Sequence, residues 1–172
     1  MADPALYTFP SPLEGYENLE PLPEVIQDDK SIANPQSGKL SEAYDHFITP
    51  LDNTKRGGFD IHVYYNTFVD TEVQFARALY ERVRREFPEL RIYKFWDKPV
   101  GPHVLAMFEV NLFTPAQFGA FVPWLAIHRG ALSVLIHPNT DEGEGLRNHT
   151  QRAVWMGERL PVRTDVFYKT KH

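Results

Sequence analysis

The stretch that decides the fold is Phe59-Asp60-Ile61-His62-Val63-Tyr64-Tyr65, in which apolar positions alternate with others. A period of two, built from β-branched and aromatic residues, predicts a strand with two different faces. The next stretch runs from the capping pattern Thr71-Glu72-Val73-Gln74 to Pro88 and has apolar residues at helical spacing. It predicts an amphipathic helix that ends at the proline. The regular part of the chain therefore begins with a strand and a helix.

The rest of the chain continues this alternation. Three more strands are predicted, over residues 90–96, 103–112 and 131–137. A second helix begins after the cap residue Thr114 and ends near Gly130, a last helix covers about 146–157, and one more short strand is expected over 162–168. The order β-α-β-β-α-β predicts an α+β, ferredoxin-like fold, with a four-stranded antiparallel sheet and helices on one face. We expect the first and third strands to be parallel central neighbours and the fourth to lie antiparallel beside the first.

Residues 1–56 differ from the remainder of the chain. Half of the 14 prolines fall in the first fifty residues, among polar residues that show no sustained period. This composition predicts a Pro-rich N-terminal arm over residues 1–56 and a single ferredoxin-like domain over residues 57–172. The step Lys55-Arg56-Gly57-Gly58 is the expected boundary.

Charge and composition exclude several classes of protein. The chain has no cysteine, so a disulfide scaffold, a thiolate metal site and a cysteine nucleophile are excluded. The net charge is −5, and the densest basic run, Arg82, Arg84 and Arg85, is interleaved with Glu81 and Glu86 on a helix, so no nucleic-acid partner is expected. No secretory pattern and no apolar run of about 18 residues is present, which predicts a cytoplasmic protein without a membrane segment.

Three histidines are predicted to meet at one end of the sheet. His62 lies near the start of the first strand, His103 starts the third, and His137 closes the fourth. In each strand the wholly apolar set of alternate positions belongs against the helices, and the histidine falls in the other set. The three choices of face agree, which favours a cluster on the open face. The alternative, that each is an ordinary packing residue of its strand, stays open.

A cluster of imidazoles with no sulfur nearby favours iron(II), manganese or zinc. Whether a carboxylate joins them is an open question. Asp60 shares a face with the first-strand histidine, whereas Glu109 lies six residues beyond His103 and is expected to be too far along the strand. Three further carboxylates follow the fourth strand: Asp141, Glu142 and Glu144. His149, on the last predicted helix, can reach the same region as a proton donor or acceptor.

Several stretches of the chain resemble the DOPA 4,5-dioxygenase family. They are Phe59-Asp60-Ile61-His62-Val63-Tyr64-Tyr65, Pro99-Val100-Gly101-Pro102-His103, Leu132-Ser133-Val134-Leu135-Ile136-His137-Pro138-Asn139-Thr140, and Asn148-His149-Thr150-Gln151 followed by Trp155-Met156-Gly157-Glu158. The resemblance covers about residues 59–158. Many bacterial relatives carry a histidine where Asp60 stands and an aspartate where Asn148 stands, which leaves the ligand set and the substrate open.

The resemblance implies a non-haem, metal-dependent extradiol dioxygenase that cleaves a catechol such as DOPA with dioxygen. It also implies Fe(II) as the metal, with zinc or manganese as stand-ins in a purified sample, and a homodimer. The metal ligands would be His62, His103 and His137. The catalytic residues would be His149 and His103. Candidate substrate contacts are Asp60, Tyr64, Trp96 and Lys98. The alternative is a non-catalytic ferredoxin-like dimer that binds a metal or a small aromatic ligand.

Overall fold

The computed structural model describes residues 9–35, 37–52, 54–140 and 144–168. The chain separates into two compact units, Met1–Ser41 and Glu42–His172. In the first unit Ile26 and Ile32 form an isolated antiparallel bridge, and the larger apolar side chains are exposed. Residues 42–56 group with the second unit rather than with the expected arm. Phe47, for example, packs edge-on against Phe59 with ring centroids 5.4 Å apart.

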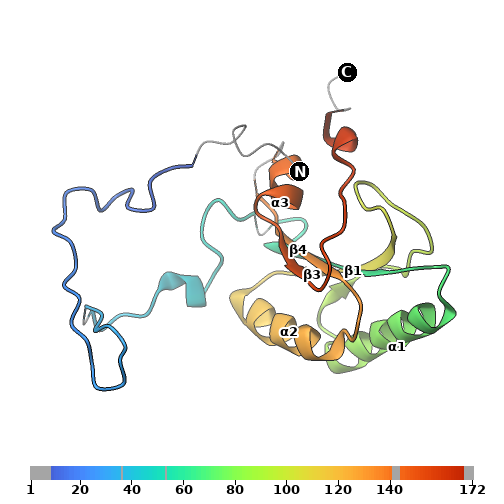
Figure 1. Ribbon diagram of the computed structural model, residues 1–172, viewed down its shortest axis with the longest axis horizontal. Coiled ribbons are helices and arrows are strands. Elements are labelled where there is room, and N and C mark those ends of the chain that lie inside the picture. Colours follow the sequence, from blue (N-terminus) through green and yellow to red (C-terminus); the bar gives the residue numbers. More distant parts are fainter. Residues whose placement is uncertain (1–8, 36, 53, 141–143, 169–172) are drawn as a thin grey trace. The chain divides into compact units, whose positions relative to one another are not determined.

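The second unit is built on one antiparallel sheet. Its strands are β1 (Phe59–Tyr65), β2 (Arg91–Ile92), β3 (Ala106–Leu112), β4 (Val134–Pro138) and β5 (Val154–Met156), in the order β2-β3-β1-β4-β5. Its helices are α1 (Asp70–Glu86), α2 (Pro115–His128) and α3 (Gly145–Thr150), with short 3-10 segments η2 (Glu42–Tyr44) and η3 (Thr164–Tyr168). Helices α1 and α2 lie against one face of the sheet, and α3 lies on the other side (Figure 1). The α+β class and the spatial order of strands β1 to β4 agree with the prediction.

Three sequence predictions about the sheet are wrong in detail. The sheet has a fifth strand, β5, where the last helix was expected to continue to residue 157. The expected tail strand is instead the 3-10 segment η3, preceded by one bridge from Val162 to His103. Strands β1 and β3 are antiparallel, not parallel, with Tyr65 opposite Ala106. The parallel arrangement failed because β3 lies between β1 and β2 and runs antiparallel to both of them.

The two faces of the sheet carry different cores, as the alternation predicted. The face toward α1 and α2 holds the main core, which includes Ile61, Val63, Tyr65, Ala106, Phe108, Val110, Leu112, Val134 and Ile136. The open face holds a smaller apolar cluster around Tyr64, Met107 and Leu135, with Trp96 and Trp155 at its edge. Burial of the first set fixes which side chains remain for the second face, because successive residues of a strand point to opposite sides.

The helix ends test two capping predictions. Thr114 caps α2 as expected, with its Oγ1 accepting from the Gln117 N–H at 3.1 Å. The capping box at Thr71 is wrong, because α1 begins at Asp70 after the N-cap residue Val69 and has no side-chain cap. The carboxylate of Glu72 instead accepts from the Asn66 N–H at 3.0 Å. Among the described residues, no helix combines the length and apolarity needed to cross a membrane.

Candidate metal centre

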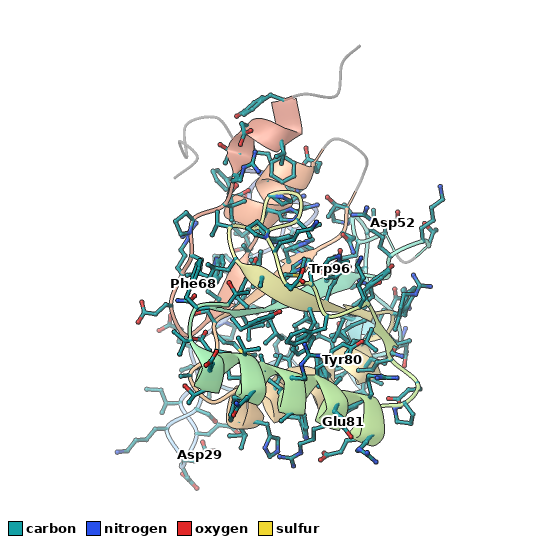
Figure 2. All side chains as sticks on the ribbon, turned by 90° about the vertical axis from the view of Figure 1, so that its right-hand side faces the viewer. Asp29, Asp52, Phe68, Tyr80, Glu81 and Trp96 are labelled. Carbon is teal, nitrogen blue, oxygen red and sulfur yellow. The ribbon has the colours of Figure 1, made fainter. Side chains whose placement is uncertain are left out.

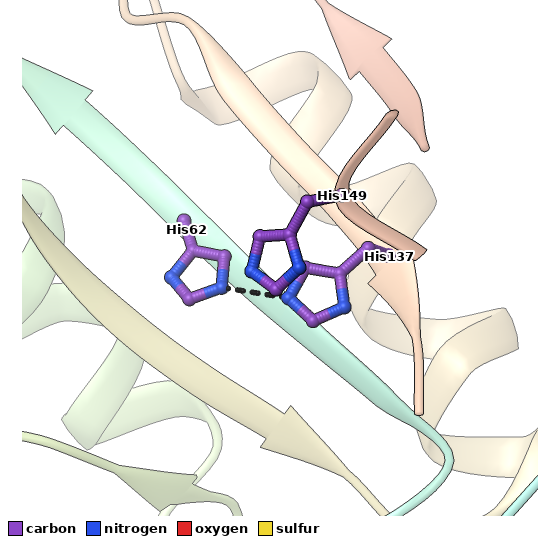
Figure 3. Close-up of side chains that lie close together, drawn as sticks. All are labelled: His62, His137 and His149. Carbon is purple, nitrogen blue, oxygen red and sulfur yellow. Dashed lines mark hydrogen bonds between the residues drawn. The ribbon is translucent and has the colours of Figure 1, made fainter. Parts of the chain in front are cut away.

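Three histidines present their ring nitrogens to one another on the open face of the sheet. His62 comes from β1, His137 from β4 and His149 from α3, and their ligand atoms all lie within 4.8 Å of one another (Figure 3). The β1–β4 register places Asp60 opposite His137, so His62 and His137 are diagonal neighbours on one face. The two strands and a short helix therefore supply one nitrogen each.

Backbone carbonyls fix which ring nitrogen of two histidines is free. His137 Nδ1 lies 3.0 Å from the Pro138 carbonyl, and His149 Nδ1 lies 2.8 Å from the Gly145 carbonyl. A carbonyl only accepts, so both Nδ1 atoms donate and both Nε2 atoms carry a lone pair. Burial lowers the pKa of His137 to about 4 and that of His149 to about 3. Both rings are neutral near pH 7 and oriented as metal-binding imidazoles usually are.

The third histidine has a nitrogen that no protein group satisfies. His62 Nε2 lies 3.1 Å from His137 Nε2, and the buried His62 Nδ1 has no hydrogen-bond partner among the described residues. If Nδ1 carries the proton, two lone pairs face each other at 3.1 Å. If Nε2 carries it, the Nδ1 lone pair is buried with the Glu109 carboxylate 3.9 Å away. A cation between the Nε2 atoms resolves the first arrangement, so the three histidines fit a metal ion.

The structure groups His149, not His103, with the other two histidines. The ring of His103 lies close to that of His62, with centroids 4.0 Å apart, but its Nδ1 is 2.6 Å from the hydroxyl of Tyr64. Both side chains are buried. Within the described ranges this nitrogen is the hydrogen-bond partner of the Tyr64 hydroxyl, so the hydroxyl donates and the proton of neutral His103 resides on Nε2. Burial lowers the pKa of His103 to about 3. His103 therefore presents a donor to the site, while its assignment as a ligand stays a prediction.

His103 reaches this position by a route that differs from the predicted one. Were the strand β3 extended backwards from Ala106, His103 would lie about 20 Å from His62, since a strand rises about 3.3 Å per residue. The segment before β3 instead leaves the sheet plane and bends back over the open face. Bridges from Trp96 to Met107 and from His103 to Val162 hold that segment.

A buried carboxylate lies beside the triad. Asp60 Oδ1 accepts from the side-chain amides of Asn111 at 2.6 Å and Asn139 at 2.9 Å, and its Oδ2 is 3.9 Å from His137 Nε2. Burial, reinforced by the nearby Glu109, raises the pKa of Asp60 to about 7. One oxygen is thus held by two amides, and the other is directed toward the histidines.

Glu109 also belongs to this site, against the expectation that it lies too far along its strand. The register pairs it with His62 across β1 and β3, and its Oε1 accepts from Asn111 Nδ2 at 2.9 Å. Burial raises its pKa. The expectation assumed that β1 and β3 are parallel with His103 beside His62; it failed because the two strands are antiparallel, which places Glu109 opposite His62.

The residues around the triad enclose a hollow of about 360 Å³. Its base is formed by the four histidines with Asp60 and Glu109, and aromatic walls come from Tyr93, Trp96 and Phe167. Trp96 lies on the opposite side of the sheet from Tyr80 and Glu81 of α1 (Figure 2). A concave site with an apolar wall and a few convergent polar groups is typical of a small-molecule site.

Two of the predicted substrate contacts do not line this hollow. The Tyr64 side chain is buried beneath the site and bonded to His103, and Lys98 is exposed in the turn that follows Trp96. Asp60 and Trp96 do line it. Of the carboxylates after β4, Asp141 and Glu142 lie outside the described residues. Glu144 pairs with arginines, as described next.

A polar network holds α3, and therefore His149, in place. Arg152 Nη1 donates to Thr140 Oγ1 and to Asn148 Oδ1, both at 2.9 Å, and it pairs with Glu144 at 3.1 Å. Asn148 is buried and also donates to Thr140 at 3.0 Å. This network joins α3 to the segment that leaves β4, so the third histidine is positioned by side chains rather than by the sheet.

Sequence reasoning missed three residues of the site. Asn111 and Asn139 were not singled out, although Asn111 shares the strand parity of Glu109, which places it on the open face. Arg56 was assigned to the arm, yet it lines the hollow. No local motif marks it, and its place follows from the chain path through Gly57 and Gly58.

A family model and one of the similar proteins point to the same family. The model of the DOPA 4,5-dioxygenase family matches residues 59–166. An uncharacterized 21.2 kDa protein from Botryotinia fuckeliana is 61% identical over 168 residues, 94% of this chain and 92% of that protein. A DOPA 4,5-dioxygenase from Amanita muscaria is 31% identical over 140 residues, 78% of this chain and 60% of that protein. A crystal structure of a "putative dioxygenase" from Nostoc punctiforme, 31% identical, superposes with a TM-score of 0.59 over 70% of this chain and 98% of that one. The chain belongs to the DOPA 4,5-dioxygenase family.

Proposed function

We propose that the protein is a metal-dependent extradiol dioxygenase that cleaves the ring of a catechol with dioxygen. The observation that carries this proposal is the neutral triad of His62, His137 and His149 at the base of a hollow with aromatic walls. Membership of the DOPA 4,5-dioxygenase family supports a dioxygenase-like function. The same hollow in a protein without turnover would merely bind a metal or an aromatic molecule, which is the alternative that the test below addresses.

The residues that would hold the metal are the three histidines, through the Nε2 atoms left free by the carbonyls of Pro138 and Gly145 in two of them. Nitrogen ligands with a neighbouring carboxylate and no sulfur suit iron(II), which we propose as the working metal. When bound, the ion supplies positive charge and open positions for oxygen-donor ligands. Asp60 Oδ2 is the carboxylate oxygen available to complete the ligand set.

The remaining side chains of the site bind and orient an aromatic diol. Tyr93, Trp96 and Phe167 offer apolar surface to a flat ring. His103 lines the hollow, and the bond between its Nδ1 and the Tyr64 hydroxyl leaves its proton on Nε2 as a donor for a ligand. A donor held in this way can stabilise negative charge on a substrate oxygen and can hand over or retain a proton. We propose this role for His103.

The proposed reaction balances without an external reductant. One ring carbon–carbon bond next to the diol breaks, and both atoms of one dioxygen molecule enter the product, an acid with an aldehyde and an enol. The ring is oxidised by four electrons and dioxygen is reduced by the same number. The hydroxyl protons of the diol must move during the reaction, which gives a histidine such as His103 a task.

Oxygen consumption tests the proposal directly. Protein loaded anaerobically with ferrous iron is mixed with catechols including DOPA, and oxygen uptake and the yellow semialdehyde product are measured. We expect one dioxygen consumed per diol, and we expect His137→Ala to lose both iron and activity. The control His46→Ala, which removes an exposed histidine, should keep both. Wild-type protein that holds iron but cleaves no diol would favour the non-catalytic alternative.

A homodimer is also proposed, as the family resemblance implies. Analytical ultracentrifugation of the full chain tests it, and a single monomeric species at micromolar concentration would contradict it.

A further inference from the structure

We propose that Arg56 binds an acidic substituent of the substrate, so that the site selects diols that carry a carboxylate over neutral catechols. This inference rests on the proposed function in one respect only, namely that the hollow holds an aromatic diol. It concerns a residue that contacts the substrate away from the reacting ring and sets specificity.

Arg56 stands where two hollows meet. The first is the aromatic-walled hollow described above, and the second, of about 420 Å³, lies beyond the histidines. Both are lined by Arg56, His137, His149 and Phe167. The second is more polar, with Asn139 among its lining residues. A ring in the first hollow can therefore extend a substituent past Arg56 into the second.

The backbone around Arg56 is anchored to the site itself. Gly57 has a φ of 82°, and a Cβ added there would lie 2.6 Å from the Leu112 carbonyl oxygen, so the chain turns tightly against β3. The Gly57 carbonyl accepts from Asn139 Nδ2 at 3.1 Å, and that same amide donates to Asp60. On the other side, Arg91 donates to the Lys55 carbonyl at 2.5 Å. The guanidinium of Arg56 is thus carried by a segment fixed at both ends.

The charge of Arg56 is unmatched at short range. Arg56 is exposed, and in the described parts of the chain its side chain makes no hydrogen bond or ion pair, whereas Arg152 and Arg147 are paired with Glu144. Among the described residues that line the first hollow it is the only lysine or arginine.

An arginine in this position suits a carboxylate better than any other common substituent. The guanidinium offers parallel N–H donors that match the two oxygens of a carboxylate, and such charge-assisted pairs are strong. Lys98, named from the sequence as a candidate substrate contact, does not line either hollow. Lys55 lines only the second. The geometry therefore distinguishes Arg56 from both lysines.

The test compares two diols that differ in one group, 3,4-dihydroxyphenylacetate and 4-methylcatechol. Binding to the full chain is measured anaerobically by calorimetry, and kcat/KM is measured with the iron-loaded protein. We expect wild-type protein to bind the acidic diol at least about tenfold more tightly than the neutral one. Arg56→Gln should bring the two affinities within about twofold by weakening the acidic diol alone. Arg56→Lys should restore part of the preference, and the control Lys98→Gln should leave it unchanged.

The outcomes separate this inference from the proposed function. Equal affinity of wild-type protein for the two diols, or binding of neither, overturns the role of Arg56. An Arg56→Gln protein that loses both diols equally also overturns it, because the residue would then only shape the hollow. Discrimination in binding that Arg56→Gln abolishes, together with no oxygen consumption for any diol, supports the inference while refuting the dioxygenase.

Discussion

The sharpest prediction concerns which histidine, His103 or His149, is the third metal ligand beside His62 and His137. The structure groups His149 with His62 and His137, and it engages His103 Nδ1 with the Tyr64 hydroxyl. We therefore expect His149→Ala to lose metal binding and His103→Ala to retain it. The family resemblance placed His103 among the ligands instead, so the two variants distinguish the alternatives.

The size of the effect follows from ligand number and linkage. Loss of an outer hydrogen-bond partner already weakens metal binding by about 10–100-fold, so loss of one of three ligands should cost at least about 100-fold. At a metal concentration of about 100 times Kd, binding stabilises wild-type protein by about 2.7 kcal/mol, but only by about 0.4 kcal/mol after a 100-fold loss. At about 2–4 °C per kcal/mol for a chain of this length, the metal raises Tm by about 5–11 °C in wild type and His103→Ala, but by about 1–2 °C in His149→Ala.

Without metal, we expect His103→Ala to be less stable toward unfolding than His149→Ala. His103→Ala leaves the buried hydroxyl of Tyr64 without an acceptor, which costs about 1–3 kcal/mol in addition to the cavity. Because Tyr64→Phe removes that hydroxyl, the double variant should recover part of the loss relative to His103→Ala. His149→Ala leaves no comparable orphan, since its Nδ1 partner is a helix carbonyl.

The assay is differential scanning calorimetry in the presence of a chelator and then of zinc, with His46→Ala as control. Zinc is redox-stable and accepts the same nitrogen ligands. A metal-induced rise in Tm that disappears in His103→Ala but persists in His149→Ala would refute the geometric assignment. Bound metal measured by mass spectrometry on the same samples must follow the same order.

Three further predictions concern the frame of the site. Gly57→Ala should destabilise the protein by about 2–3 kcal/mol in urea unfolding, because its positive φ and the Leu112 carbonyl 2.6 Å from the new Cβ both oppose the change; a loss below about 1 kcal/mol would contradict this. Arg152→Met should weaken metal binding about tenfold in chelator competition while leaving the far-ultraviolet circular dichroism intact, because α3 loses its anchor; unchanged affinity would count against it. Metal-free protein should lose stability as pH falls below about 6.5, because the pKa values of His103 (about 3), His137 (about 4) and His149 (about 3) lie below the unfolded value, so that the unfolded chain binds protons first, at about 1.4 kcal/mol per pH unit for each histidine. Asp60 offsets one of the three, because its pKa, raised to about 7, lets the folded chain bind that proton first. Constant stability between pH 6.5 and 4.5 would refute it.

The faces of the sheet could be predicted because strand alternation is a local property. Ile61 and Val63 pack on the helices while His62 and Tyr64 point the other way, and this follows from a period of two without knowledge of any partner strand. The location of His62 and His137 on the open face was therefore accessible from the sequence. So was the cap of α2, since Thr114 and its target are three residues apart.

The composition of the site was not accessible in the same way, because it depends on irregular segments. The turn that brings His103 back over the sheet, the short helix that carries His149, and the step that places Arg56 beside them have no periodic signal. The error in the relative direction of β1 and β3 had little effect on the face assignment, because parity is independent of strand direction. The error did affect which residue of β3 was expected beside His62, and for that reason Glu109 was expected to lie too far from the site.

The distribution of buried polar groups argues that the open face is a functional site rather than a second structural core. All buried polar or charged side chains of the described residues lie in or beside the open face: Asp60, His62, His103, Asn111, His137 and Asn148. A face kept only for packing would be more stable if it were apolar, because each buried polar group costs free energy unless it is fully paired. The pairing here is incomplete, since His62 Nδ1 and Asn111 Oδ1 have no partner among the described residues. These incompletely paired groups lower the stability of the fold where three neutral imidazoles converge on a small volume. A metal ion bound by these imidazoles would offset that loss of stability.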